Sequence, residues 1–524
     1  MKILHRAPLT LSLPCWIVFG ALVPASAAAG TLQVGPDKQY KAVKDAVAAA
    51  QSGDTIEVDP GEYVDDISSI KVGDLTIRGV GGARAHLKAV APPPNKKGIL
   101  VIEAGVGPVT IEHLELSGSK ISEGDGNNGA GIRAQGTDLR VRDCYIHDNQ
   151  NGVLSNASAI TIEFSEFANN GEAGYEHNVY VGESPKPVFR GNYSHHAKRG
   201  YALKSRALEN YIYYNRLMDE GDGIGSGLID LPQGGLSYVV GNLIQKGLAA
   251  ENKTRVVLYK GEGGTNPDLR LFVSHNTFVN DGAPNSTFVD VKAASEVTMT
   301  NNLFVGPGTP YALADNNIPL TNIGGLQTEL AVLVDRAGYD YHLMPDAEPI
   351  DLGQMLAMDL TPDSHYLHPM QVVARPLVDA PDVGAYEFGE GAPGTTDGET
   401  GMTGMTGMTG MTGMTGMTGS ETGGESGATG GETGGESGAT GGETGGDSLT
   451  GGETGGDSRT GGLPTTAGPT TAGPTTADGT TGATAGAIDD GADGCGCRSE
   501  GTRGPGWALF GLLALVGRRA RTRR

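Results

Sequence analysis

Short runs in which apolar and polar residues alternate recur through the middle of the chain, and each run ends in a turn rich in Gly, Asn or Asp. Examples are "RVRDCYIHDN" at 140–149, "FVSHNTFVN" at 272–280 and "TMTNNLFVG" at 298–306. Side chains alternate between the two faces of a β-strand, so a period of two predicts strands with one buried face. The pattern therefore predicts an all-β region made of many short strands.

These runs align into repeats. Each has a small or amide residue at one position, and the intervals between these positions are 21, 27, 23, 27, 34 and 26 residues. The aligned residues are Cys144, Ser165, Asn192, Asn215, Asn242, Asn276 and Asn302. The residues two further on are Ile146, Phe167, Ser194, Leu217, Ile244, Phe278 and Phe304, and only Ser194 is not apolar. A second strand series precedes each position: "GIRA", "GVLS", "NVYV", "ALKS", "LIDL", "VVLY" and "FVDV".

Repeats of this kind predict a parallel β-solenoid, in which each repeat forms one coil and the coils stack about 4.8 Å apart. Amides at one corner of successive coils can hydrogen-bond along the stack and satisfy the backbone there. Cys144 is then a small ladder residue and not a reactive thiol. The apolar residues two positions on form the core.

The start of the region predicts a helix that caps the first coil. Ala42, Val43, Ala46, Val47 and Ala50 recur at helical spacing, and Gly53 ends the run. The whole segment "YKAVKDAVAAAQSGDTIEVDPGEY" at 40–63 resembles the entry of right-handed parallel β-helix proteins of the pectate-lyase-like superfamily. "YDYHLMPDAEPIDLG" and "DVGAYEF" resemble the closing segment of bacterial surface β-helix proteins with C-terminal anchors.

This resemblance covers about residues 30–390, for which it implies a right-handed parallel β-helix with an N-terminal capping helix. The superfamily includes lyases, hydrolases, epimerases and non-catalytic adhesins. The resemblance therefore predicts the fold and leaves the activity open.

The two ends of the chain predict export and surface attachment. Residues 1–29 contain Lys2, Arg6, an apolar stretch and "ASAAAG", the layout of a cleavable secretory signal that would also remove Cys15. Residues 391–494 are rich in Gly, Thr, Glu and Pro and predict a disordered stalk.

The last segment, 495–524, holds Cys495 and Cys497, an apolar run at 507–517 and an Arg-rich end. It resembles the myxobacterial sorting signal MYXO-CTERM. This implies processing by cell-envelope sorting machinery and display at the cell surface or outer membrane, with release from the cell also left open. A simple C-terminal membrane anchor is the alternative.

Charge and cysteine content exclude two classes of protein. The formal net charge of −23 argues against a nucleic-acid partner, which needs a basic face. Four cysteines, one of them in the signal, are too few for a disulfide-stapled scaffold. We expect a monomer.

Candidate chemistry lies in "GYALKSRA" at 200–207, which places Lys204 and Arg206 on one face of a strand, about 6.6 Å apart. The strand alternation predicts that both point outward. A polar stripe is expected to run over neighbouring coils through the outward or adjacent residues His177, Tyr180, Lys204, Arg206, Asp230, Lys260 and Glu262, with His196 in the same coil as His177. A register shift of one residue, which the pattern leaves open, would turn Asp230 or Lys260 inward. A solvated surface with ordinary ion pairs is the plainer interpretation.

The resemblance to superfamily lyases implies that the stripe binds an acidic polysaccharide and cleaves it by β-elimination. Arg206 would bind the sugar carboxylate, and Asp230, Lys260, Glu262 and His196 would contact the polymer. Lys204 would be the base only if its pKa fell by about 3 units, and otherwise His177 or Tyr180 takes that role. A Ca²⁺ held by Asp230 and Glu262 would ease that fall.

The expected anion facing Lys204 and Arg206 is a substrate carboxylate, with Asp230 as the intramolecular rival. The alternative function is a non-catalytic adhesin that binds glycan or matrix along the same stripe. The polymer itself is not specified by the sequence.

Overall fold

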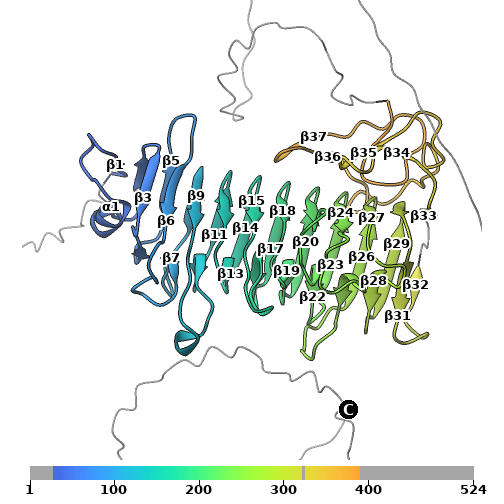
Figure 1. The fold of residues 1–524 in the computed structure, drawn as a ribbon, viewed down its shortest axis with the longest axis horizontal. Helices are drawn as coiled ribbons and strands as arrows, with labels where there is room; N and C mark the ends of the chain where they lie inside the picture. Colours follow the sequence, from blue (N-terminus) through green and yellow to red (C-terminus); the bar gives the residue numbers. More distant parts are fainter. Residues whose placement is uncertain (1–27, 322–324, 390–524) are drawn as a thin grey trace, which may run out of the picture. The chain divides into compact units, whose positions relative to one another are not determined.

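The computed structural model describes residues 28–321 and 325–389, and nearly all of these lie in one solenoid with a small layer against it (Figure 1). The chain winds repeatedly through three parallel sheets, so that β10, β11, β12 and β13 follow one another from sheet C to A to B and back to C. Each coil thus supplies one strand to each sheet.

Sheet A has 12 strands. They are β1 (Thr31–Val34), β2 (Thr55–Val58), β5 (Leu75–Gly79), β8 (Val109–Glu112), β11 (Leu139–Arg142), β14 (Ala159–Glu163), β17 (Lys186–Arg190), β20 (Glu209–Tyr213), β23 (Leu236–Val240), β26 (Arg270–Ser274), β29 (Glu296–Thr300) and β32 (Leu320–Thr321).

Sheet B has 11 strands. They are β3 (Gly61–Val64), β6 (Ala85–Lys88), β9 (Leu114–Ser117), β12 (Tyr145–His147), β15 (Glu166–Ala168), β18 (Tyr193–His195), β21 (Arg216–Met218), β24 (Leu243–Lys246), β27 (Thr277–Asn280), β30 (Asn302–Val305) and β33 (Gly325–Thr328).

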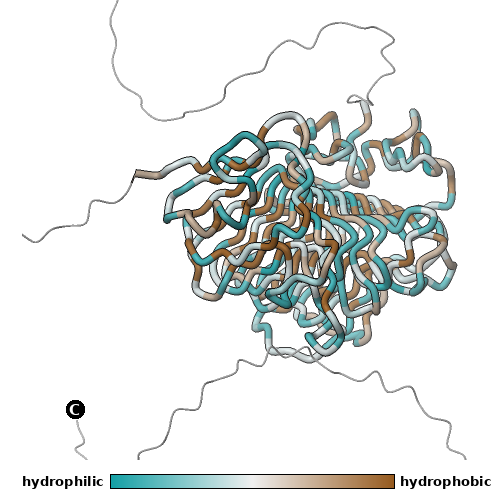
Figure 2. The backbone as a smooth tube through the Cα atoms, turned by 60° about the vertical axis from the view of Figure 1, so that its left-hand side comes forward, coloured by the Kyte–Doolittle hydropathy of each residue, from teal (hydrophilic) through white to brown (hydrophobic). Residues whose placement is uncertain are grey.

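Sheet C has 10 strands. They are β4 (Ser68–Ile70), β7 (Gly98–Ile102), β10 (Ala130–Ala134), β13 (Asn151–Ser155), β16 (Val179–Val181), β19 (Tyr201–Ser205), β22 (Gly227–Leu231), β25 (Arg255–Tyr259), β28 (Thr287–Val291) and β31 (Thr309–Leu313). The predicted all-β solenoid is confirmed, and so is the alternation. Figure 2 shows the coils stacked one behind another, with apolar and polar positions alternating along them.

The predicted capping helix is α1 (Val43–Ala49), which buries Val43, Ala46 and Val47 against the first coil. Its first backbone amides are satisfied from another element. The carboxylate of Asp66 accepts hydrogen bonds from the N–H groups of Val43, at 2.5 Å, and Lys44, at 2.8 Å. The helix therefore closes the apolar end of the solenoid and is itself held by the turn between β3 and β4.

The predicted amide ladder is also confirmed, and it lies at the turn from sheet A to sheet B. Asn215 donates from its backbone N and from Nδ2 to Oδ1 of Asn242, both at 2.9 Å, and Asn242 contacts Asn276 in the same way. The residue before each ladder position turns the corner with a positive φ, as at Tyr214 (54°). Cys144 is fully buried at one end of this ladder, and burial raises the pKa of its thiol to about 12.

The last part of the described chain does not continue the solenoid. Four strands, β34 (Leu333–Asp335), β35 (Asp340–Leu343), β36 (Ser364–Leu367) and β37 (Gln371–Ala374), form two antiparallel pairs. They pack over the far end of sheet B around a second apolar cluster that includes Met218, Leu243, Tyr341 and Tyr366 (Figure 1). This C-terminal layer covers sheet B from about β18 onward and leaves its earlier strands open.

The predicted signal peptide lies outside the described residues except for its last two positions. The stalk at 391–494 and the segment 495–524 with Cys495 and Cys497 lie wholly outside them. Within 28–321 and 325–389, no helix is long and apolar enough to cross a membrane.

Candidate functional site

The predicted stripe lies on the outer face of sheet C. Tyr180, Lys204 and Asp230 are in register on β16, β19 and β22, as the sequence alternation predicts. The next residue in this row is Leu258 and not Lys260. Lys260 lies just beyond the end of β25 with a φ of 59°, so its expected place in the row is corrected.

Lys204 and Arg206 are already paired with carboxylates of the chain. The Lys204 ammonium lies 3.1 Å from Asp230 Oδ2 and 3.1 Å from Glu262 Oε1. Glu262 also reaches Arg206, whose Nη2 is 2.5 Å from Oε2. Asp230, the carboxylate of the chain that could take the place of a substrate anion, does contact Lys204. Glu262 contacts both cations.

The arrangement keeps Lys204 charged. Burial by itself would lower the pKa of Lys204, but the nearby carboxylates of Asp230 and Glu262 outweigh it and raise the pKa above its usual value. The same two cations outweigh the effect of burial on Glu262 and lower its pKa. A lysine that holds its proton this firmly is a poor general base, so the geometry argues against that role for Lys204.

His177 is unsuited to proton abstraction for a different reason. Its side chain is buried, and burial together with Lys204 and Arg206 lowers its pKa well below the usual value. Its Nδ1 accepts a hydrogen bond from the backbone N–H of Tyr201 at 3.1 Å, so the proton of the neutral ring is on Nε2. The free lone pair that a base requires is therefore already in use.

Tyr180 is the predicted base that the geometry favours. It is half-buried, and its hydroxyl oxygen accepts a hydrogen bond from Arg206 Nε at 2.9 Å. This contact holds the phenolic oxygen beside the guanidinium that would bind a sugar carboxylate.

The structure does not bring His196 to the stripe. Its Nδ1 lies 2.6 Å from Nδ1 of His195, at the end of β18 in sheet B, and its Nε2 lies 2.9 Å from Asp222. His195 is the last residue of β18, and His196 follows it where the chain turns toward sheet C. His196 therefore belongs to another cluster.

The pair Asp230 and Glu262 does not fit a Ca²⁺ site. Calcium needs six to eight oxygen ligands, whereas here the Lys204 ammonium lies between the two carboxylates and supplies the positive charge. The second oxygen of Asp230, Oδ1, is buried without a hydrogen-bond partner among the described residues. One buried carboxylate oxygen without a partner does not supply the ligand set that calcium needs.

The sequence analysis missed a second polar row, on the outer face of sheet B. Residues one and three positions after each ladder residue point outward there, and they include Tyr145, His147, Glu166, Tyr193 and His195. The register of the ladder contained this information, because a residue next to an inward one must face outward. A second amide ladder, through Asn149, Asn170 and Asn178, holds the turn that leaves this sheet.

Comparison with known proteins agrees with this architecture. Residues 63–244 match the family described as "Right handed beta helix region", which makes the solenoid a right-handed parallel β-helix. No curated protein matches the chain.

Three solved structures show the range of proteins with similar folds. The pectate lyase Pel9A shares 12% identity at a TM-score of 0.43, with 69% of this chain and 97% of that chain covered. The PL6 family alginate lyase AlyGC shares 14% at 0.31, with 58% and 40% covered. A pectin methylesterase from Aspergillus niger shares 12% at 0.23, with 59% and 93% covered. Similarity this low carries no argument about activity.

Proposed function

We propose that the outer face of sheet C binds an acidic polysaccharide, with a uronate carboxylate taking the place that Glu262 holds against Lys204 and Arg206. The observation that carries the proposal is the bridging position of Glu262, which contacts both cations through its two oxygens. Its side chain is 44% exposed, whereas that of Asp230 is 3% exposed. Glu262 can therefore leave the cations without disturbing the buried pair beneath.

The loop that carries Glu262 suits this exchange. Gly261, Gly263 and Gly264 surround it, and an added Cβ at Gly263 would meet nothing within 4 Å. A sugar carboxylate that replaces Glu262 restores the same charge-assisted hydrogen bonds, and Arg206 can grip it with two N–H groups. The exchange costs little because one carboxylate is replaced by another.

Cleavage by β-elimination is the second candidate, and the contact between Tyr180 and Arg206 favours it. In that reaction Arg206 neutralises the sugar carboxylate, and Tyr180 in its phenolate form takes the C5 proton. The electron pair of that C–H bond forms the 4,5 double bond as the bond between C4 and the glycosidic oxygen breaks, and the leaving oxygen takes the proton that Tyr180 has just gained, which regenerates the phenolate. The product absorbs in the ultraviolet, so catalysis and simple binding are readily distinguished.

The test is a panel of alginate, pectate, glucuronan and glycosaminoglycans, with the full chain and two variants. Glu262→Gln removes the competing charge and should tighten binding to the correct polymer. Arg206→Lys loses the bidentate hydrogen bonds to a carboxylate and should weaken polymer binding about tenfold, the equivalent of a lost charge-assisted hydrogen bond. Release of an unsaturated product that stops in Tyr180→Phe would establish the lyase.

The matched control is Glu57→Gln, which removes a carboxylate from an exposed ion pair with Arg78 on sheet A, at 2.6 Å. It should leave polymer binding unchanged. Equal affinities for the Glu262→Gln, Arg206→Lys and unaltered proteins would exclude the outer face of sheet C as the polyanion site.

We further propose that the protein is exported and kept at the cell surface, with residues 1–29 as the secretory signal and 495–524 as the sorting segment. The order of cysteine pair, apolar run and Arg-rich end supports this proposal. Changing Cys495 and Cys497 to Ser should abolish surface display, measured with an antibody on whole cells. Normal display of that double variant would reduce the segment to a plain anchor.

A further inference from the structure

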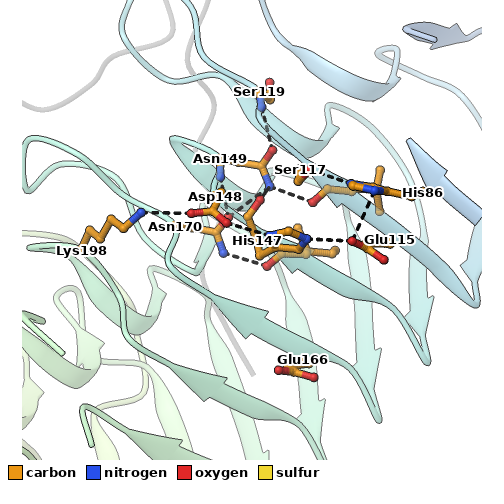
Figure 3. A network of polar contacts seen from close by, with 12 residues as sticks. His86, Glu115, Ser117, Ser119, His147, Asp148, Asn149, Glu166, Asn170 and Lys198 are labelled. Atoms are coloured by element: carbon orange, nitrogen blue, oxygen red, sulfur yellow. Dashed lines mark hydrogen bonds and ion pairs between the residues drawn. The ribbon is translucent and has the colours of Figure 1, made fainter. Parts of the chain in front are cut away.

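Three side chains from successive coils meet on the open part of sheet B, away from the sheet C stripe. They are His86 on β6, Glu115 on β9 and His147 on β12 (Figure 3). His86 and Glu115 are directly in register, and His147 lies diagonally across from Glu115, in register with Ser117. One nitrogen of each histidine and one oxygen of Glu115 lie within 4.8 Å of one another.

The distances suit a small divalent ion. His86 Nδ1 lies 3.4 Å and His147 Nε2 lies 3.1 Å from the same oxygen of Glu115, Oε1. Two ligands at tetrahedral angles around Zn²⁺, each about 2.0–2.1 Å from the ion, are about 3.3–3.4 Å apart. The side chains are 15–28% exposed, so a fourth position faces solvent.

The outer contacts of both histidines orient them toward this point. His147 Nδ1 lies 2.8 Å from Asp148 Oδ2, and Asp148 is in turn held by the Lys198 ammonium at 3.1 Å (Figure 3). His86 Nε2 lies 2.7 Å from the Ser117 hydroxyl. A metal-bound histidine typically donates its other N–H to a carboxylate or a similar acceptor, and both rings have one.

His147 has a carboxylate on both sides of its ring. Its Nδ1 faces Asp148 and its Nε2 faces Glu115, whereas a neutral imidazole has only one N–H to donate. A metal ion between Nε2 and Glu115 would satisfy the second contact while Nδ1–H donates to Asp148. Three carboxylates gather here, because Glu62 Oε2 also lies 3.9 Å from His86 Nδ1, although Lys88 pairs with Glu62 at 3.0 Å.

We propose that His86, Glu115 and His147 form a Zn²⁺ site, with Asp148 and Ser117 as its outer hydrogen-bond partners. Two imidazoles and one carboxylate suit zinc, whereas calcium prefers oxygen ligands alone. The fourth position takes water or an oxygen of a bound molecule. This site is independent of the proposed polysaccharide binding on sheet C.

The experiment measures zinc bound by the full chain with Cys495→Ser and Cys497→Ser, because free thiols also bind zinc. The protein is stripped with a chelator and dialysed against zinc sulfate at neutral pH. One zinc ion per chain is expected, and an excess of Ca²⁺ should not displace it. His147→Gln and Glu115→Gln should lose it, and Asp148→Asn should bind it about 10–100-fold more weakly.

His196→Gln is the matched control, since His195, His196 and Glu220 form the other group of potential ligands in the described chain. It should leave the zinc content unchanged. Circular dichroism establishes that each variant is folded. Zinc retained by folded His147→Gln and Glu115→Gln, zinc lost in His196→Gln, or no zinc bound at all would each overturn the proposal.

Discussion

The amide ladder offers a prediction whose size follows from individual hydrogen bonds. Asn242 lies in its middle, fully buried. Its Oδ1 accepts from the backbone N–H and from Nδ2 of Asn215, and its Nδ2 donates to the carbonyl of Ile212 at 2.9 Å. Asn242→Leu has a similar shape but removes every one of these bonds.

The cost of Asn242→Leu can be summed from those bonds. The Asn215 N–H is left buried without an acceptor, at about 1–3 kcal/mol, and the Ile212 carbonyl loses a donor, at about 0.5–1.5 kcal/mol. We therefore expect a loss of roughly 1.5–4.5 kcal/mol in the free energy of unfolding. The structure suggests its own control, because Ser165 fills the same position in an earlier coil.

There, the Ser165 hydroxyl accepts from the N–H of Cys144 at 3.1 Å and donates to the carbonyl of Glu163 at 2.9 Å. Asn242→Ser should reproduce both contacts and lose the Nδ2 bonds to Ile212 and Asn276 and some packing, about 1–2 kcal/mol. Guanidinium unfolding followed by circular dichroism should rank the proteins as unaltered, Ser and then Leu. Hydrogen exchange should locate the loss at residues 210–244, since solenoid coils can open separately. Equal midpoints for the Leu and Ser variants would refute the reasoning.

Three further outcomes are expected. Burial, aided by Arg375, lowers the pKa of His275 to about 3, against about 6.5 in the unfolded chain, so the unfolded chain binds more protons below pH 6.5. This contribution to stability is complete above pH 6.5 and falls by about 2 kcal/mol at pH 5; His275→Gln should remove this part of the pH dependence, and an unchanged profile would contradict it. Lys246 and Asp219 form a buried pair at 3.2 Å, so Lys246→Met should cost about 3–5 kcal/mol in urea unfolding, while adding Asp219→Leu should restore most of it. Finally, Lys204→Arg keeps the positive charge but cannot give up a proton. Because Lys204 is not expected to act as the base, this variant should retain polymer binding and any turnover. Loss of turnover would show that Lys204 is the base.

Local pattern alone predicted most of the solenoid. The helix over 43–49 followed from its apolar spacing, and the ladder from Cys144 to Asn302 followed from aligned small and amide residues. Both signals are strong because equivalent positions in successive coils have the same buried environment. An inward side chain meets its equivalents one coil above and below, so a residue type that fits once is reused.

The candidate sites depended on information that a repeat pattern does not carry. Alternation correctly placed Tyr180, Lys204 and Asp230 on one face, but the residue paired with Asp230 is Leu258, and Lys260 lies two positions further on, beyond the end of β25. Which anion meets Lys204 was decided by the return of the loop that carries Glu262, 58 residues further along the chain. No local signal specifies such a contact.

The sequence by itself determined which residues face the core, because burial of apolar side chains at a period of two depends only on near neighbours. The tertiary structure alone decided which outward residues become partners, because coil stacking brings together residues that lie about 30 positions apart, such as His86, Glu115 and His147. It also decided that the C-terminal layer covers the far end of sheet B and leaves these three open. The number of residues in each coil decides which outward residues of neighbouring coils lie side by side, and that number varies from one repeat to the next.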